Sequence, residues 1–155
     1  MTTHVNRVTE LAAYVGQSLG TSSHRTVTQS MISAFADVTD DHQWIHVDPE
    51  RAKDSPFKST VAHGYLTLSL VAPLVHEILT TDHQGFRLNY GLNRVRFPSP
   101  LLAGSSIYAD AVLASYEEIP GGIQITLDIT VHSSTSEKPV CVAQGVYRYY
   151  AEGLS

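Results

Sequence analysis

The residues best suited to chemistry gather between Phe35 and Leu70, in the stretch FADVTDDHQWIHVDPERAKDSPFKSTVAHGYLTLSL. This stretch contains the only tryptophan, Trp44, and three of the eight histidines. Three of its carboxylates stand within two residues of a histidine: Asp40, Asp41 and Asp48. Aspartate and histidine can hold and deprotonate a water near neutral pH. A titratable loop that leads into an apolar helix therefore indicates a site for acid–base chemistry.

Asp41 and His46 stand five residues apart, and His63-Gly64 opens the apolar run that follows. Taken alone, an Asp and a His at this spacing are more often a turn cap and a loop histidine than a catalytic pair. Asp48 is expected to cap a helix rather than to act as a second base. A metal site of Asp41, His46 and His63 is a rival interpretation. The spacing matches no zinc loop and HExxH is absent, so we expect no metal.

One long helix is predicted to carry this loop. Residues 61–79 are apolar nearly all round, which indicates a buried helix, and Pro73 should kink or loosen it. Residues 49–52 should form a short helical turn, with Asp48 as cap and Pro49 at the first position. Three more elements are predicted upstream: a helix over residues 8–17, a brief strand over 24–27 and a helix over 29–38.

The second half of the chain alternates apolar and polar residues and predicts a meander of four long antiparallel strands. They are expected over residues 85–97, 105–116, 123–132 and 140–150, separated by Pro, Gly and Ser. We therefore predict one α+β domain over residues 1–155, with the sheet wrapped around the apolar helix. One sheet face stays uncovered, and we expect a homodimer formed through an edge strand or a loop face.

The composition of the chain excludes several classes of function. Net charge is −5 and no basic stripe is present, so nucleic-acid binding is not expected. The longest apolar stretch, residues 65–75, is far shorter than the ~20 residues that span a bilayer. The N-terminus has no secretion-signal pattern. The single cysteine, Cys141, excludes an internal disulfide and is expected to be a small buried hydrophobe. A cytoplasmic location fits.

Four motifs occur in order: DDHQWIH at residues 40–46, DP at 48–49, AHG at 62–64 and NYGLNRVRFPSP at 89–100. Together they resemble the MaoC-like, (R)-specific enoyl-CoA hydratase family, and more closely its branch of short proteins related to nodulation protein N. The family signature is Gly-Asp-x-Asn-Pro-aliphatic-His, then Asp-Pro, then His-Gly at the start of the long helix. Asp40 replaces the signature glycine. If that position needs a left-handed backbone, Asp tolerates it better than most residues.

The resemblance implies a hot-dog fold and the hydration of a trans-2-enoyl thioester to an (R)-3-hydroxyacyl thioester, without a metal or redox cofactor. Asp41 would act as base, with His46 as its partner in proton delivery. The backbone N–H of Gly64, at the start of the helix, would polarise the thioester oxygen. In some relatives a hydroxyl from the helix steadies the Asp. It has no clear match here, and Thr67 and Ser69 are the only candidates.

The substrate would be a thioester of coenzyme A or of acyl carrier protein, both of which carry phosphates. His63 is expected to pack or hydrogen bond at the helix start and to border the substrate. Arg94, Arg96 and Lys53 are candidates for phosphate contacts, although such residues are more often a solvated face. Two rival functions stay open: a hot-dog thioesterase and a non-catalytic acyl-binding or partner subunit.

Overall fold

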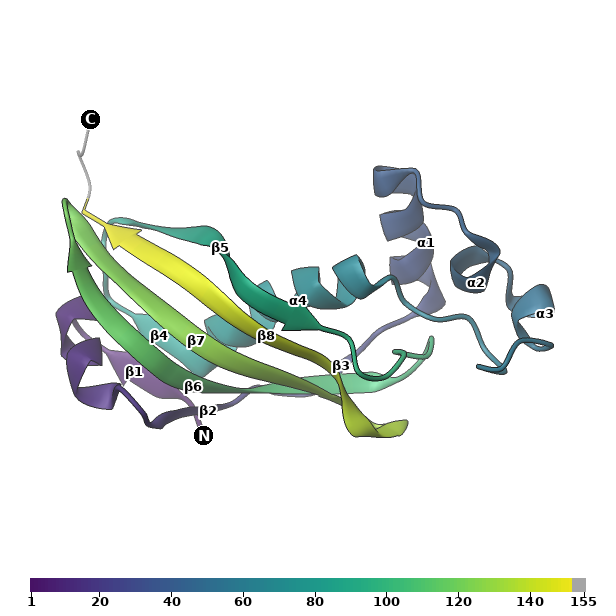
Figure 1. The fold of residues 1–155 in the computed structure, drawn as a ribbon, viewed down its shortest axis with the longest axis horizontal. Coiled ribbons are helices and arrows are strands. Elements are labelled where there is room, and N and C mark those ends of the chain that lie inside the picture. Colours follow the sequence, from purple (N-terminus) through teal and green to yellow (C-terminus); the bar gives the residue numbers. More distant parts are fainter. Residues whose placement is uncertain (152–155) are drawn as a thin grey trace.

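A computed structural model describes residues 1–151 and leaves residues 152–155 undescribed. Helix α4 (Gly64–Ile78) lies along one face of an antiparallel sheet (Figure 1). The strand order is β2 (Ser18–Thr21), β6 (Ser106–Ile119), β7 (Gly122–Ser133), β8 (Ser136–Tyr150) and β5 (Phe86–Arg96), and β3 (Arg25–Thr26) also pairs with β6. This arrangement confirms the predicted α+β architecture.

The long helix is present but is buried on one side only, whereas its nearly all-round apolar composition predicts burial on every side. Its buried residues, Leu66, Thr67, Val71, Leu74, Val75 and Ile78, lie within one half of the helix circumference, and Tyr65, Ser69 and His76 are exposed on the other half. The helix begins at Gly64 rather than at residue 61, because Val61 bridges to Leu102 and the N–H of Ala62 donates to the carbonyl of Leu101 at 2.8 Å. Pro73 lies inside the helix, which continues to Ile78.

All four predicted long strands are present. The predicted order is wrong for the first of them, β5, which does not pair with the strand that follows it in the chain. Strand β5 pairs with β8, the last strand in the chain, and only β6, β7 and β8 form a meander. The physical reason is that β6 has no free edge for β5. Strand β7 occupies one edge of β6, and β2 and β3 occupy the other. Strand β5 therefore forms an outer edge of the sheet.

The N-terminal prediction needs correction. Residues 8–17 do not form an α-helix: Val8–Tyr14 is a 3₁₀ helix, η1, whose only buried residue is Leu11. A single buried residue gives too little apolar contact to hold a longer helix. Strand β2 follows it and was not predicted. Strands β1 (Thr3–Val5) and β4 (Leu79–Thr81), also not predicted, pair in parallel as a separate two-stranded sheet.

Three short helices lie together beyond the N-terminal end of α4 (Figure 1). Helix α1 (Gln29–Thr39) confirms the predicted helix and begins with the Thr28 hydroxyl accepting from the N–H of Met31. Helix α2 (Trp44–Val47) was not predicted, whereas α3 (Pro49–Ala52) confirms the predicted turn, with Asp48 as its cap. No helix within residues 1–151 combines the length and apolarity needed to cross a bilayer.

Candidate active site

The end of α1 determines where Asp41 lies. Asp40 adopts a left-handed conformation, with φ 57° and ψ 27°, which stops the helix and turns the chain. The N–H groups of Asp40 and Asp41 both donate to the carbonyl of Ala36, the latter at 3.1 Å. A left-handed residue at this position is a common way to end a helix. Asp41 follows this turn directly and is exposed.

His46 is held from several directions. Its Nδ1 lies 2.6 Å from the carbonyl oxygen of Val61, in a contact that is buried. Because a carbonyl oxygen can only accept, Nδ1 carries a proton and Nε2 is the nitrogen left for exchange with a substrate. The Gln29 side-chain amide donates to the His46 carbonyl at 2.8 Å and accepts from the Thr60 hydroxyl. The loop is thereby attached to both α1 and the chain before α4.

His63 connects the two residues. Its Nε2–H donates to the backbone carbonyl of Asp41 at 3.0 Å, and its ring stacks on the His46 ring with centroids 3.8 Å apart. Phe35 packs against it at 5.0 Å. Both imidazoles are almost fully buried, with exposures of 7% for His46 and 3% for His63. Within residues 1–151, Nδ1 of His63 is the one buried side-chain polar atom without a hydrogen-bond partner. Such a group typically costs about 1–3 kcal/mol.

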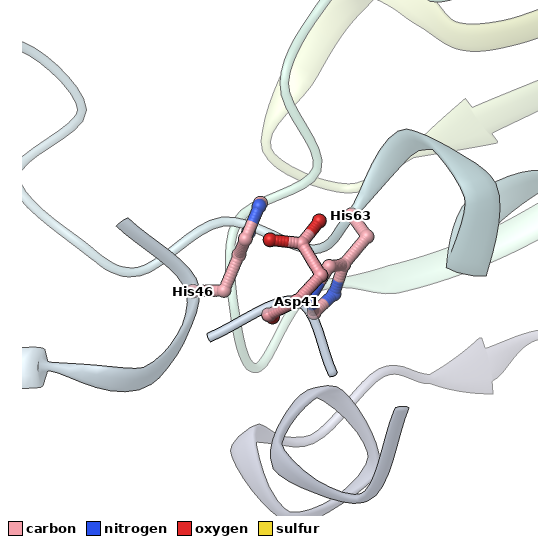
Figure 2. A group of neighbouring side chains, drawn as sticks. All are labelled: Asp41, His46 and His63. Atoms are coloured by element: carbon pink, nitrogen blue, oxygen red, sulfur yellow. Dashed lines mark hydrogen bonds between the residues drawn. The ribbon is translucent and has the colours of Figure 1, made fainter. Parts of the chain in front are cut away.

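Asp41, His46 and His63 therefore form one cluster (Figure 2). Each offers a nitrogen or oxygen that lies within 4.8 Å of the others, and the Asp41 carboxylate points toward the His46 ring. Three such groups are the smallest set that holds zinc in catalytic sites. His63 already engages Asp41 through Nε2–H, and His46 engages Val61 through Nδ1–H. The expectation that no metal binds here remains a prediction.

The N-terminus of α4 adjoins this cluster. No side chain caps the helix, so the positive end of its dipole is available to a developing anion. Gly64 is the first helical residue, and a Cβ added there would lie 3.0 Å from atoms of the Phe97 ring. A cavity of about 280 Å³ opens beside Gly64 and is bordered by Thr67 and Leu101.

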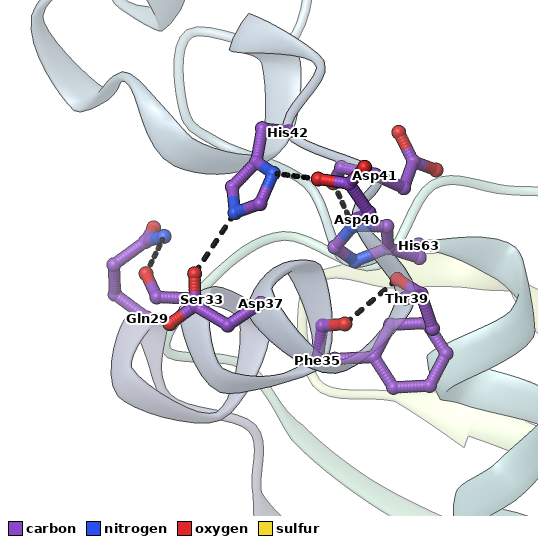
Figure 3. A network of polar contacts seen from close by, with 9 residues as sticks. All are labelled: Gln29, Ser33, Phe35, Asp37, Thr39, Asp40, Asp41, His42 and His63. Carbon is purple, nitrogen blue, oxygen red and sulfur yellow. Dashed lines mark hydrogen bonds and ion pairs between the residues drawn. The ribbon is translucent and has the colours of Figure 1, made fainter.

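His42 lies outside the cluster despite its position in the same loop (Figure 3). Its Nε2 contacts an Asp37 oxygen at 2.8 Å, and its Nδ1 lies 3.4 Å from an Asp40 oxygen. The hydrogen bond to Asp37 is the main cause that raises the pKa of His42 above its ordinary value, and the charge of Asp40 adds to it. His42 and the two carboxylates form an exposed network on the surface of α1.

The remaining predicted residues lie apart from the cluster. Lys53 forms an exposed ion pair with Glu50 at 2.7 Å. Arg94 and Arg96 lie on the sheet face opposite α4, because they pair with Gln144 and Val142 while the buried Ala143 and Cys141 face the helix. Arg94 contacts Asp128 at 3.4 Å, and Arg96 donates to the carbonyl of Val95.

The two hydroxyl candidates and the cysteine also have other partners. Thr67 and Ser69 each donate to a carbonyl four residues earlier in α4, those of His63 and Tyr65, rather than to Asp41. Cys141 is fully buried, as expected of a small hydrophobe, and burial raises the pKa of its thiol to about 11. A thiol that stays protonated is a poor nucleophile.

Three contributors to the site were not singled out from the sequence: Gln29, Phe35 and the carbonyl of Val61. Gln29 reads only as a polar residue at the start of α1, and a backbone carbonyl has no signature in sequence. Phe35 is one of the apolar residues of the α1 pattern, which predicts a buried face without naming its neighbour. Its contact with His63 depends on how α1 packs against the start of α4.

The chain is similar to known proteins in sequence and in fold. Residues 10–134 match the family described as MaoC like domain. The chain is 46% identical over 145 residues to "3-hydroxyacyl-thioester dehydratase Z" of Mycobacterium tuberculosis H37Rv, covering 93% of this chain and 96% of that protein. It is 39% identical over 146 residues to "Nodulation protein N" of Rhizobium meliloti, covering 92% and 91%. The unliganded R-hydratase PhaJ1 of Pseudomonas aeruginosa has the same fold, with a TM-score of 0.71 at 22% identity over 89% and 83% of the two chains.

Proposed function

This chain belongs to the MaoC-like domain family and has its hot-dog fold, and on that basis we propose that it is a hydro-lyase acting on acyl thioesters. The reaction we assign is the reversible, (R)-specific hydration of trans-2-enoyl-CoA to (R)-3-hydroxyacyl-CoA. The observation that carries this proposal is the Asp41–His46 pair, held beside the uncapped start of α4. The names of the similar 3-hydroxyacyl-thioester dehydratase Z and R-hydratase PhaJ1 also support this proposal.

The pair suits the addition of water. Asp41 takes a proton from the water as the water oxygen bonds to the β-carbon. That proton passes from Asp41 to Nε2 of His46, and Nε2 gives it to the α-carbon. The Val61 carbonyl keeps Nδ1 protonated, so exchange takes place at Nε2 alone. One proton enters the pair and one leaves it, so the charge of the pair is the same after each turnover.

The start of α4 suits the thioester. As the α-carbon gains electron density, the thioester oxygen becomes negative and needs donors that are already in place. We assign this role to the Gly64 N–H at the positive end of the helix dipole. An apolar cavity of about 280 Å³ lies one turn further along α4, between Leu68, Ala72 and Leu92 of β5, and is our candidate for the acyl chain.

One of the predicted cations remains our candidate for binding a substrate phosphate. Lys53 follows α3, the helix next after α2, which carries His46, and it is our candidate for a phosphate of coenzyme A or carrier protein. Arg94 and Arg96 of the same chain lie on the sheet face opposite α4, so we do not propose that they bind a substrate phosphate. The chemistry proposed needs no metal or redox cofactor. We place the protein in the cytoplasm, where its free Cys141 needs no disulfide partner.

We also propose a homodimer formed through β5. This strand is an 11-residue sheet edge, and its Phe86, Leu88, Tyr90 and Leu92 are each 45–58% exposed. Long apolar edge strands are normally covered, because their unpaired backbone groups recruit another strand. Tyr65 of α4 is a further uncovered aromatic side chain, 72% exposed. A second copy of the chain would cover both.

The test follows the absorbance of crotonyl-CoA with the wild type, Asp41→Asn and His46→Gln. We expect conversion to (R)-3-hydroxybutyryl-CoA by the wild type and losses of roughly a hundredfold or more in each variant. His42→Gln is the matched control: it removes a histidine from the same loop but outside the cluster, and should leave the rate unchanged. A flat wild-type trace with release of free thiol would instead identify a thioesterase. A flat trace without thiol would identify a binding subunit.

A further inference from the structure

His63 is the residue whose chemistry the proposed reaction does not use. It lies at the junction of three elements: the loop after α1, the helix α2 and the start of α4. One edge of its ring donates to the Asp41 carbonyl at 3.0 Å, and one face stacks on His46, with 21° between the ring planes. At 3% exposure, it is largely shielded from solvent.

Stability does not explain a histidine at this position. The Asp41 carbonyl requires a proton on Nε2, which leaves Nδ1 of the neutral ring as a buried acceptor with no donor. A phenyl ring would fill nearly the same space and pack on His46 and Phe35 without that penalty. A buried polar group left unpaired is a feature that functional sites tolerate and ordinary cores avoid.

The start of α4 does not explain it either. The His63 side chain makes no capping hydrogen bond to the helix, and Thr67 bonds only to the His63 backbone. What the imidazole does provide is a donor and a flat face in one rigid ring. The Nε2–H donor binds the carbonyl of Asp41, and the face of the ring stacks on the ring of His46.

We propose that His63 is a positioning residue that sets the Asp41 carboxylate relative to Nε2 of His46. The inference rests on the proposed function, because it assigns His63 a task within that reaction. The backbone of Asp41 has two anchors, the Ala36 carbonyl and His63 Nε2–H. His46 keeps its bonds to Val61 and Gln29 whatever stands at position 63. Loss of the His63 donor therefore frees Asp41 more than His46.

The expected result is a fall in kcat without a matching change in KM. A displacement of about 1 Å in a catalytic group typically costs roughly a hundredfold in rate. We expect His63→Phe to lower kcat by about ten- to a hundredfold, with KM nearly unchanged and a melting temperature equal to or above that of the wild type. His63→Gln keeps a side-chain N–H for the Asp41 carbonyl and should recover part of the lost kcat.

His83→Phe is the matched control. The Nε2 of His83 also bonds to a backbone carbonyl, that of Tyr150 at 2.8 Å, and its ring also packs on an aromatic side chain, Tyr149. It does so at the opposite end of α4 from the cluster. The same substitution there removes the same kind of contact and should leave kcat unchanged.

Amide hydrogen exchange gives a readout that does not depend on turnover. The Asp41 N–H should exchange faster in His63→Phe than in the wild type and in His83→Phe, because one of its two anchors is lost. Wild-type kcat in His63→Phe, or unchanged exchange at Asp41, would overturn the positioning role. So would a loss of activity that follows a fall in melting temperature.

The two proposals fail in different ways. If Asp41→Asn and His46→Gln are inactive while His63→Phe is fully active, the proposed function stands and the positioning role falls. If the wild type hydrates no enoyl thioester, the proposed function falls. The exchange measurement still decides whether His63 anchors Asp41.

Discussion

Replacing Asp40 by glycine should stabilise this protein. Asp40 ends α1 in a left-handed conformation, and its side chain is 99% exposed, with one long contact to His42 at 3.4 Å. Glycine is the usual residue at such a position because it has no Cβ to clash with the following carbonyl. It is also the residue that the family signature has before the catalytic aspartate. Asp40→Gly therefore restores the favoured backbone without removing a buried contact.

The size of the gain follows from the backbone. A left-handed conformation costs an L-residue roughly 1–2 kcal/mol, and aspartate pays toward the low end of that range. Removing a negative charge from the C-terminal end of α1 acts in the same direction. Glycine has greater conformational freedom in the unfolded chain, and this reduces the stabilisation by about 0.5 kcal/mol. The net gain is about 0.5–1 kcal/mol, which raises the melting temperature of a chain of this length by about 1–4 °C.

Thermal unfolding of Asp40→Gly, Asp40→Ala and Lys58→Gly tests this reasoning. Lys58 is the other non-glycine residue with positive φ, at 58°, within residues 1–151, so its replacement should also stabilise. Asp40→Ala removes the same charge but keeps a Cβ, and it should destabilise. Equal stabilisation by Asp40→Ala and Asp40→Gly would refute the backbone argument, since charge alone would then explain the gain. Hydration of crotonyl-CoA should be unchanged in Asp40→Gly, because Asp41 keeps both backbone anchors.

Two further predictions concern the surface. We expect the wild type to sediment as a dimer and the double variant Leu88→Lys/Leu92→Lys to sediment with the mass of one chain, 16.9 kDa, because charges on β5 oppose edge pairing. A wild-type monomer would contradict the proposed interface. NMR titration of His42 should give a pKa above the ordinary 6.5, which Asp37→Asn lowers. A raised folded-state pKa means that this contribution to stability is full below pH ~6.5 and is lost as pH rises through the folded value.

The sequence predicts the elements well where periodicity is long. The strict alternation from Ile123 to Val131 became β7, and the apolar run after His63 became α4. The partner of β5 was not predictable in this way, because alternation fixes which face a residue occupies but not which strand lies beside it. The four-residue helix α2 gives too short a pattern to recognise.

The side chains of the candidate site were predictable from the sequence, but the contacts that hold them were not. Asp41, His46 and His63 were identified by residue type and by order along the chain, and the structure brings them together. What holds them is mostly backbone: the carbonyls of Ala36, Val61 and Asp41. Carbonyls are common to every residue, so no sequence pattern distinguishes these three. The exposed cations Arg94 and Arg96 show the converse: their residue type suggested phosphate contacts, whereas their alternation with Val95 of the core places them on the outer face of the sheet.

The position of α4 in the chain has a consequence for synthesis. The helix ends at Ile78, and the sheet that covers it is complete only at Tyr150, about 70 residues later. At ~5–20 residues per second, the ribosome exposes an uncovered apolar helix for about 4–14 s. The cluster also forms late, because the segment before α4 hydrogen bonds to Leu101 and pairs with Leu102. We therefore expect chaperones to bind the nascent chain, and we expect the cluster to be held in place only after Leu102 has left the ribosome.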